Sequence, residues 1–290
     1  MTESGDTMTT LGRLCHAADD LPTIPESLSR ILEVLEDPDS GARDLADVVR
    51  TDAPLASKIV RLANSPLYRL HRQVESIHEC VAALGYATVR QVALCVAVVS
   101  SLGSTCGRRG ATVDYRELWR HCVATGAVAR LLAQSAGLGD AEAAFTRGLL
   151  HDVGKFVMIL RFPRQYGEAI FDRRQSGRPL VDIERERFGF DHAEAGAALA
   201  LHWHFPAELV GAIGGHHEPV PADPAVAVIA LADALAYGLQ PPSCDLGGVA
   251  DNVAMAGLLR CLDVAPDALA GWQEAMSQAV SDAAPLAQLD

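Results

Sequence analysis

The chain has 290 residues, of which 49% are hydrophobic and 21% charged, and its formal net charge is −13. This hydrophobic content is enough for a large core and excludes a generally disordered protein. The acidic charge disfavours nucleic acid and membrane surfaces as partners, because their phosphate groups repel it. The N-terminus shows no basic, apolar targeting signal, and the most apolar run, residues 92–99, is shorter than the ~20 residues of a membrane span. We therefore expect a cytoplasmic protein.

Seven cysteines are scattered along the chain, and no two form a CxxC pair. Most have apolar neighbours, as Cys95 does. This pattern is typical of reduced, buried thiols, and it excludes a disulfide framework or a zinc finger.

The apolar residues follow a helical period along most of the chain, and the alternation typical of strands is nearly absent. We therefore predict an all-α fold, with an N-terminal helical bundle packed on a second helical domain. The predicted helices cover residues 23–35, 44–50, 55–63, 76–84, 87–102, 115–135, 141–160, 181–187, 192–201, 207–216, 225–237, 250–261 and 266–282.

A stretch with three glycines and two arginines, residues 103–112, interrupts the helical pattern. We interpret it as a linker rather than a phosphate-binding loop, because it lacks a glycine-rich fingerprint. The predicted division is an N-terminal module over residues 1–105, a domain with the candidate site over residues 111–240, and a helical extension over residues 241–290.

The strongest chemical signal is the adjacent pair His151-Asp152 in the segment GLLHDVGKF. Neighbouring side chains on a helix project about 100° apart, so both could reach one metal ion in a cleft. Histidine is a borderline ligand, and an aspartate can bridge two cations. Taken alone the dipeptide is a weak signal, and the alternative is a solvated helix position.

Other histidines and acids strengthen this signal. Glu117 and His121 stand four residues apart, which places them on one face of a predicted helix. Asp233 interrupts an apolar helix, where a carboxylate is costly unless it is paired or bound to metal. The remaining candidates are His192 in GFDHAEAG and the pair His216-His217 in GHHEP. Such side chains on different helices are how helical proteins build dinuclear sites.

Some of these histidines also have structural interpretations. Asp191 could cap a helix whose first turn contains His192. His216 and His217 could end a helix, where the dipole favours histidine. Both interpretations are compatible with metal binding.

The order of the candidates resembles the HD superfamily of metal-dependent phosphohydrolases. Segments such as LADVVRTDAPLASKIVRLANSPLY, FGFDHAEAGAALALHW and AIGGHHEP are similar to the HDOD module of bacterial signalling proteins, over about residues 15–240. HDOD proteins look like relatives of the HD-GYP phosphodiesterases, although many have lost metal ligands and act as non-catalytic modules. This chain keeps every matching ligand position. It lacks a Gly-Tyr-Pro signature after Glu218, which argues against cyclic dinucleotide recognition.

The resemblance implies a role for each candidate. A first metal ion would be held by His121, His151, Asp152 and Asp233. A second, bridged by Asp152, would be completed by His192 and His216, while Glu117 and His217 match positions used for a third metal in some relatives. Two ions about 3.5–4 Å apart would generate a hydroxide and clamp a phosphoryl group, with iron or manganese favoured and zinc possible. Lys155 would neutralise the phosphate charge, so Asp152 and Lys155 are the predicted catalytic residues.

Three functions stay open at this point. The first is an HDOD signalling protein that hydrolyses a nucleotide-type phosphoester at a dinuclear site. The second is a non-catalytic HDOD module that acts through signalling partners, with a structural or vestigial metal site and a nucleotide or cyclic dinucleotide as a candidate ligand. The third, least favoured, is a DNA-binding regulator: residues 44–64 have the spacing of a helix-turn-helix, but their aspartates cancel much of the basic charge.

Overall fold

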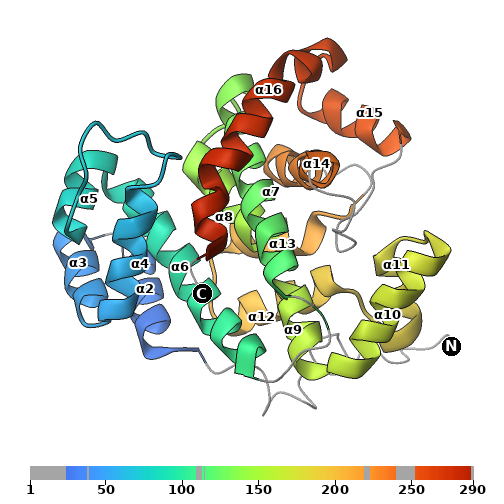
Figure 1. Ribbon diagram of the computed structural model, residues 1–290, viewed down its shortest axis with the longest axis horizontal. Helices are drawn as coiled ribbons and strands as arrows, with labels where there is room; N and C mark the ends of the chain where they lie inside the picture. Colours follow the sequence, from blue (N-terminus) through green and yellow to red (C-terminus); the bar gives the residue numbers. More distant parts are fainter. Residues whose placement is uncertain are drawn as a thin grey trace, which may run out of the picture.

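The computed structural model describes residues 24–37, 39–108, 113, 115–218, 223–239 and 252–288. Within these ranges all regular secondary structure is helical, which confirms the all-α prediction (Figure 1). In the described part of the chain, no helix is both long and apolar enough to cross a membrane.

The helices fall into three successive groups (Figure 1). The N-terminal group consists of α2 (Glu26–Glu36), α3 (Ala42–Arg50), α4 (Ala53–Ala63), α5 (Ile77–Leu84) and α6 (Tyr86–Arg108). The middle group consists of α7 (Tyr115–Ala136), α8 (Ala141–Leu150), α9 (Val153–Arg161), α10 (Pro163–Ser176), α11 (Leu180–Phe188), α12 (His192–His202), α13 (Ala207–Gly215) and α14 (Pro224–Leu239). The last group consists of α15 (Asn252–Cys261), α16 (Pro266–Ala283) and the 3-10 helix η2 (Ala284–Gln288).

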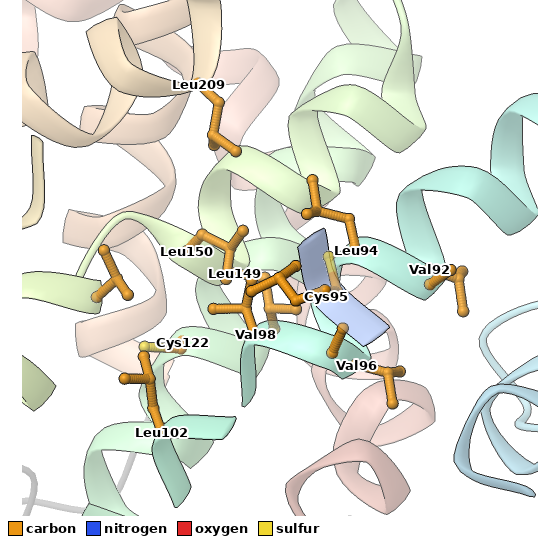
Figure 2. Close-up of a cluster of buried hydrophobic side chains, with 14 of the residues drawn as sticks. Val92, Leu94, Cys95, Val96, Val98, Leu102, Cys122, Leu149, Leu150 and Leu209 are labelled. Atoms are coloured by element: carbon orange, nitrogen blue, oxygen red, sulfur yellow. The ribbon is translucent and has the colours of Figure 1, made fainter. Parts of the chain in front are cut away.

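Buried side chains of the N-terminal group and of α7 to α13 form one continuous core. Figure 2 shows part of it, where Leu94 and Val98 of α6 pack with Leu149 and Leu150 of α8. The C-terminal helices join the same body, since the Trp119 indole on α7 donates a 3.0 Å hydrogen bond to a carbonyl of η2. The groups therefore support one another, and the domain boundaries at residues 105, 111 and 240 stay a prediction.

Helix α6 is longer than predicted. It continues to Arg108, so residues 103–108 of the expected linker are helical, and residues 109–112 lie outside the described residues. A glycine inside a helix costs about 1 kcal/mol relative to alanine, which is too little to end a helix whose earlier turns are buried in the core. The prediction that the helical pattern stops at Gly103 was therefore wrong.

Helix α10 has no counterpart among the predicted helices. Most of its residues are polar, and only Tyr166, Ala169 and Ile170 are buried, so its apolar period is weak. Its ends do carry a sequence signal, since Pro163 opens the helix and Gly177 follows it with a φ of 68°. Proline at the first position and glycine just past the last are typical of helix boundaries.

The predicted continuous helix over residues 141–160 is divided in the structure. Helix α8 ends at Leu150 and α9 begins at Val153, so the pair His151-Asp152 forms the junction between them. Asp152 leaves the helical conformation, with φ −95° and ψ 16°. The two side chains therefore do not project from one continuous helix. They converge at the point where α8 has ended and α9 has not yet begun.

Candidate metal centre

Histidine and aspartate side chains from several helices meet inside the middle group. Helices α7, α9, α12 and α13 lie near the centre of the molecule in Figure 1. The side chains come from α7, the α8–α9 junction, the start of α12, the end of α13 and the middle of α14. Six of them are at most 5% exposed, namely His121, His151, Asp152, His192, His216 and Asp233. Burying so many ionisable groups is costly unless they are paired or bind a cation.

Close contact between α7 and α8 positions the first of these side chains. A Cβ atom added to Gly148 would lie 2.9 Å from the Cα atom of Gly126, so only glycine lets the two backbones touch. His121 lies on α7 and His151 directly follows α8. The glycine contact thus brings both histidines to one side of the crossing.

A second close contact joins α9 to α12. A Cβ atom on Gly154 would lie 1.8 Å from the carbonyl oxygen of His192, which no side chain could tolerate. On the facing helix, a Cβ atom added to Gly196 would lie 3.0 Å from the backbone nitrogen of Gly154. This contact holds the start of α12 against Asp152.

The first ligand group consists of His121, His151 and Asp233, whose ligand atoms all lie within 4.8 Å of one another. The Oδ1 atom of Asp233 is 2.7 Å from Nε2 of His121 and 3.6 Å from Nε2 of His151. The fold thus brings together residues that are far apart in the sequence, since more than a hundred positions separate His121 from Asp233. Asp233 is thus paired, as its position in an apolar helix required.

The second ligand group consists of Asp152, His192, His216 and His217, again within 4.8 Å of one another. Oδ1 of Asp152 is 3.2 Å from Nε2 of His192 and 3.6 Å from Nε2 of His216. Nε2 of His217 is 2.8 Å from Nε2 of His192. This group has three imidazoles and one carboxylate.

Asp152 stands between the two groups. Its Oδ1 atom faces the second group, while its Oδ2 atom is 3.3 Å from Nε2 of His151 and 3.8 Å from Nε2 of His121. One carboxylate therefore presents a different oxygen to each group. This is the arrangement that a carboxylate needs in order to bridge two cations.

Three histidines aim the same ring nitrogen at the centre. The Nδ1 atoms of His151 and His216 are each 2.7 Å from a backbone carbonyl three residues earlier in the chain. Nδ1 of His192 is 2.6 Å from a carboxylate oxygen of Glu184. Carbonyls and carboxylates only accept hydrogen bonds, so each Nδ1 carries a proton and, in the neutral ring, each Nε2 keeps its lone pair. Second-shell acceptors of this kind orient metal-binding histidines.

Several atoms at the centre have no hydrogen-bond partner. Three of them face the ligand groups, namely Nε2 of His151, Nε2 of His216 and Oδ1 of Asp152, and Nδ1 of His121 is a fourth. Buried polar atoms without partners are rare, because leaving them unsatisfied is costly. Here all three point at the ligand groups, so a bound cation would satisfy them. The mixed nitrogen and carboxylate donors fit iron, manganese or zinc.

The electrostatics of the centre favour positive charge. Burial lowers the pKa of His151, but the nearby carboxylates of Asp152 and Asp233 together outweigh burial and raise that pKa to about 10. Burial also lowers the pKa of His192, but the carboxylates of Glu184 and Asp152 together outweigh burial and raise that pKa to about 9. Burial raises the pKa of Asp152, but His151 and Lys155 hold it well below its usual range. Protons on these histidines and divalent cations therefore compete for the same place.

The pair His216-His217 behaves differently. Burial lowers the pKa of both histidines, and the neighbouring imidazoles push the pKa of His217 further down, well below its usual range. Both rings are therefore neutral near pH 7, which is the form that binds a metal. His216 also caps the C-terminus of α13, and Asp191 caps α12 in front of His192. The structural interpretation of these residues is thus confirmed, and it is compatible with metal binding, which stays a prediction.

Lys155 is buried on α9, and its Nζ atom is 2.6 Å from Oδ2 of Asp152. The ammonium group therefore contacts the carboxylate between the two groups. Its predicted contact with phosphate stays a prediction. Glu117 differs from the other candidates, since it is half-buried on α7 and belongs to none of the ligand groups within the described residues.

Three residues at the centre were missing from the sequence prediction. Glu184 is fully buried and contacts His192, and Tyr166 donates a hydrogen bond to Glu184. The Cys122 sulfur lies within 4.8 Å of the ligand atoms of His151 and Asp152. Glu184 stands four residues after the buried Leu180, so it shares the apolar face of α11. That spacing indicates that Glu184 is buried. The charged residues that follow it in the run ERER instead suggest a solvent-exposed segment.

The family model of the HDOD domain matches residues 21–219. The chain belongs to the HDOD family. An uncharacterized protein of Treponema pallidum is 26% identical over 223 residues, which are 74% of this chain and 42% of that protein. Ribonuclease Y of Thermus thermophilus is 29% identical over 221 residues, which are 71% of this chain and 34% of that protein. The HDOD chain thus spans less than half of each of these relatives.

Solved structures share this fold over nearly its whole length. An HDOD domain protein of unknown function from Geobacter sulfurreducens is 25% identical, with a TM-score of 0.77 and coverage of 96% of this chain and 97% of that one. A candidate phosphohydrolase from Shewanella amazonensis is 24% identical, with a TM-score of 0.75 and the same coverage. At this identity, the likeness to the Shewanella structure shows a shared fold.

Proposed function

We propose that this HDOD protein is a metal-dependent phosphohydrolase with a dinuclear centre. The observation that carries the proposal is the position of Asp152, whose two oxygens face two separate groups of buried ligands. A single structural ion would need only one of these groups. Two groups that share a carboxylate are the protein side of a two-metal site.

The residues divide the work between the two ions. His121, His151 and Asp233 would hold the first ion, and His192, His216 and His217 the second, with Asp152 shared. When bound, such ions act as Lewis acids and lower the pKa of bound water. Backbone carbonyls and Glu184 hold the Nδ1 atoms of His151, His216 and His192, so the Nε2 atoms would be available to the ions. Lys155 supplies one further positive charge beside the shared carboxylate.

A small phosphoester of nucleotide type is the substrate class that we favour. The name of the Thermus relative describes an enzyme that acts on RNA, and the Shewanella structure is named as a candidate phosphohydrolase. The net charge of −13 disfavours a long polyanion and leaves a small anion, which local cations could neutralise. We favour iron or manganese as the metal.

A non-catalytic signalling module is the second candidate, and one contact favours it. Lys155 already pairs with Oδ2 of Asp152 at 2.6 Å, which is the oxygen that faces the first ligand group. A lysine fixed there could replace the charge of one ion and leave a structural site. The protein would then act by binding signalling partners.

The DNA-binding alternative gains little from the structure. Arg50 pairs with Asp47, and Lys58 donates a hydrogen bond to Ser100, so these two cations already have partners within the chain. A DNA-contacting helix would instead present such side chains to phosphates.

The test is metal analysis joined to a hydrolysis screen. The protein is purified without chelator, reconstituted anaerobically with Fe²⁺ or Mn²⁺, and assayed on mononucleotides, cyclic dinucleotides and a short RNA. We expect two ions per chain and hydrolysis that Asp152→Asn abolishes. Two ions without hydrolysis of any substrate would favour the signalling module. No bound metal after reconstitution would contradict the dinuclear centre.

A further inference from the structure

Glu184 on α11 is a buried carboxylate with three hydrogen bonds. One oxygen accepts from the backbone N–H of His192 at 2.9 Å and from Nδ1 of the same residue at 2.6 Å. The other oxygen accepts from the Tyr166 hydroxyl at 2.7 Å. Glu184 and Tyr166 are both 0% exposed. A carboxylate buried at this cost, away from the surface, points to a specific task.

The position of His192 explains why an external acceptor is needed. His151 and His216 follow helices, so each finds a carbonyl three residues earlier in its own helix. His192 is the first residue of α12, and the residues before it lie outside that helix. Its Nδ1 atom therefore has no such carbonyl within reach and takes the carboxylate of Glu184 instead.

We propose that Glu184 is the positioning residue of the second metal ion, and that Tyr166 holds the carboxylate in place. The carboxylate fixes the proton on Nδ1 of His192 and so turns the Nε2 lone pair to Asp152 and His217. Hydrogen bonds from α10 to α11 and from α11 to α12 thus fix the orientation of one candidate metal ligand, His192. This inference rests on the proposed dinuclear centre.

A structural role alone would give a different pattern of effects. If Glu184 only fills space, any side chain of its size should support metal binding equally. If it orients His192, the acceptor oxygen is what counts. The pair Glu184→Met and Glu184→Gln separates these cases, because both keep the size and only glutamine keeps an acceptor.

The experiment is a Co²⁺ titration of the chelator-stripped full chain, followed by competition with a chelating dye and by the visible absorption of the bound ion. We expect Glu184→Met to weaken the second Co²⁺ ion by about 10–100-fold and to alter its absorption, with the first ion unchanged. Glu184→Gln should weaken it less. The control is Glu186→Met on the same helix, where an exposed carboxylate paired with Arg178 is lost; its titration should match that of wild type.

The outcomes separate this inference from the proposed function. A wild type that binds two ions, with Glu184→Met binding both equally well, overturns the role of Glu184 and leaves the dinuclear centre. A wild type without bound Co²⁺ overturns both. If Glu184→Met does not fold, Tyr166→Phe replaces it, since this change removes only one hydrogen-bond donor. Tyr166→Phe should weaken the second ion several-fold, and an unchanged affinity would overturn the inference.

Discussion

The two ligand groups differ in charge. The first group has its own carboxylate, Asp233, which is 2.7 Å from His121. The second group has three imidazoles, and its only carboxylate is the shared Asp152. A cation in the first group is therefore neutralised locally, whereas one in the second depends on Asp152. We expect the first ion to bind more tightly and the second to be lost first.

The groups also differ in how they are supported. The first group lies where α7 and α8 touch at Gly126 and Gly148, and His151 is oriented by the carbonyl of Gly148. The second group includes His192, which needs both the contact at Gly154 and the carboxylate of Glu184. Backbone groups orient His151 and His216, whereas His192 of the second group also needs a side chain from another helix. Substitutions that separate these supports should therefore act on one ion at a time.

Replacing the shared carboxylate should have the largest effect. Asp152→Asn removes a charge from both groups and breaks the buried ion pair that Asp152 forms with the ammonium of Lys155. We expect the variant to bind neither ion at the wild-type affinity and to lose about 3–5 kcal/mol in its free energy of unfolding. Elemental analysis and urea denaturation measure the two effects.

Two control variants separate metal binding from stability. Asp172→Asn removes an exposed carboxylate that pairs with Arg187, and it should cost no more than about 1 kcal/mol. The double variant Asp152→Asn, Lys155→Met removes the buried ion pair altogether, so it should regain stability without regaining metal. Binding of both ions at the wild-type affinity by this double variant would show that Asp152 is not a ligand.

Substitutions in single groups come next in size. Asp233→Asn should remove the first ion and leave the second, and His216→Ala should do the reverse, so each variant should retain one ion per chain. Each loss should exceed the roughly 10–100-fold weakening that outer-shell changes cause. Isothermal titration with Mn²⁺ measures it. If either variant lost both ions, the two groups would be one site.

A glycine substitution tests the packing that supports the second group. Gly154→Ala places a Cβ atom 1.8 Å from the His192 carbonyl, so α9 and α12 must separate. We expect a loss of about 1–3 kcal/mol or more in the free energy of unfolding, and a weaker second ion. The control Gly211→Ala has no atom within 4 Å of its new Cβ and should be neutral or stabilising by up to about 1 kcal/mol. Equal thermal stability of the two variants would contradict this packing.

The smallest expected effect is a dependence on pH. The pKa values of His151 and His192 in the metal-free fold, about 10 and about 9, exceed the ordinary value of 6.5. Their protonated pairs thus stabilise the metal-free fold fully below pH 6.5, and this contribution is lost as pH rises through 9 and 10. Metal binding displaces these protons, so it should strengthen over the same interval. The difference in Tm between metal-loaded and metal-free protein should widen from pH 6.5 to 9; a constant difference would contradict the competition.

Most of the fold was predictable from the sequence, because helical period and capping residues are local. The helices around His121 and Asp233 follow from apolar spacing alone. The exceptions have physical causes: α10 has too few buried residues to show a period, and α6 passes through Gly103 because its earlier turns are buried. The break at His151-Asp152 was also missed, since a continuous apolar pattern runs across it.

The sequence allowed the candidate metal ligands to be predicted, but not the residues that orient these ligands. Histidine and aspartate at characteristic positions stand out in a sequence, and the structure brings seven of the eight predicted metal-site residues into the two ligand groups. Glu117 is the exception. The spacing of Glu184 from Leu180 indicates only that its side chain is buried, whereas its contact with His192 on another helix requires the fold. The contact of Lys155 with Asp152 likewise requires the fold, although both residues lie within one turn.

The central claim is that one carboxylate joins two metal ions. Electron paramagnetic resonance of the Mn²⁺-reconstituted wild-type chain tests it most directly, because ions that share a bridging ligand couple their spins. We expect two Mn²⁺ ions per chain and an exchange-coupled spectrum, with a single uncoupled ion in Asp233→Asn. A wild type that binds one ion, or two ions with the six-line signal of isolated Mn²⁺, would contradict the claim.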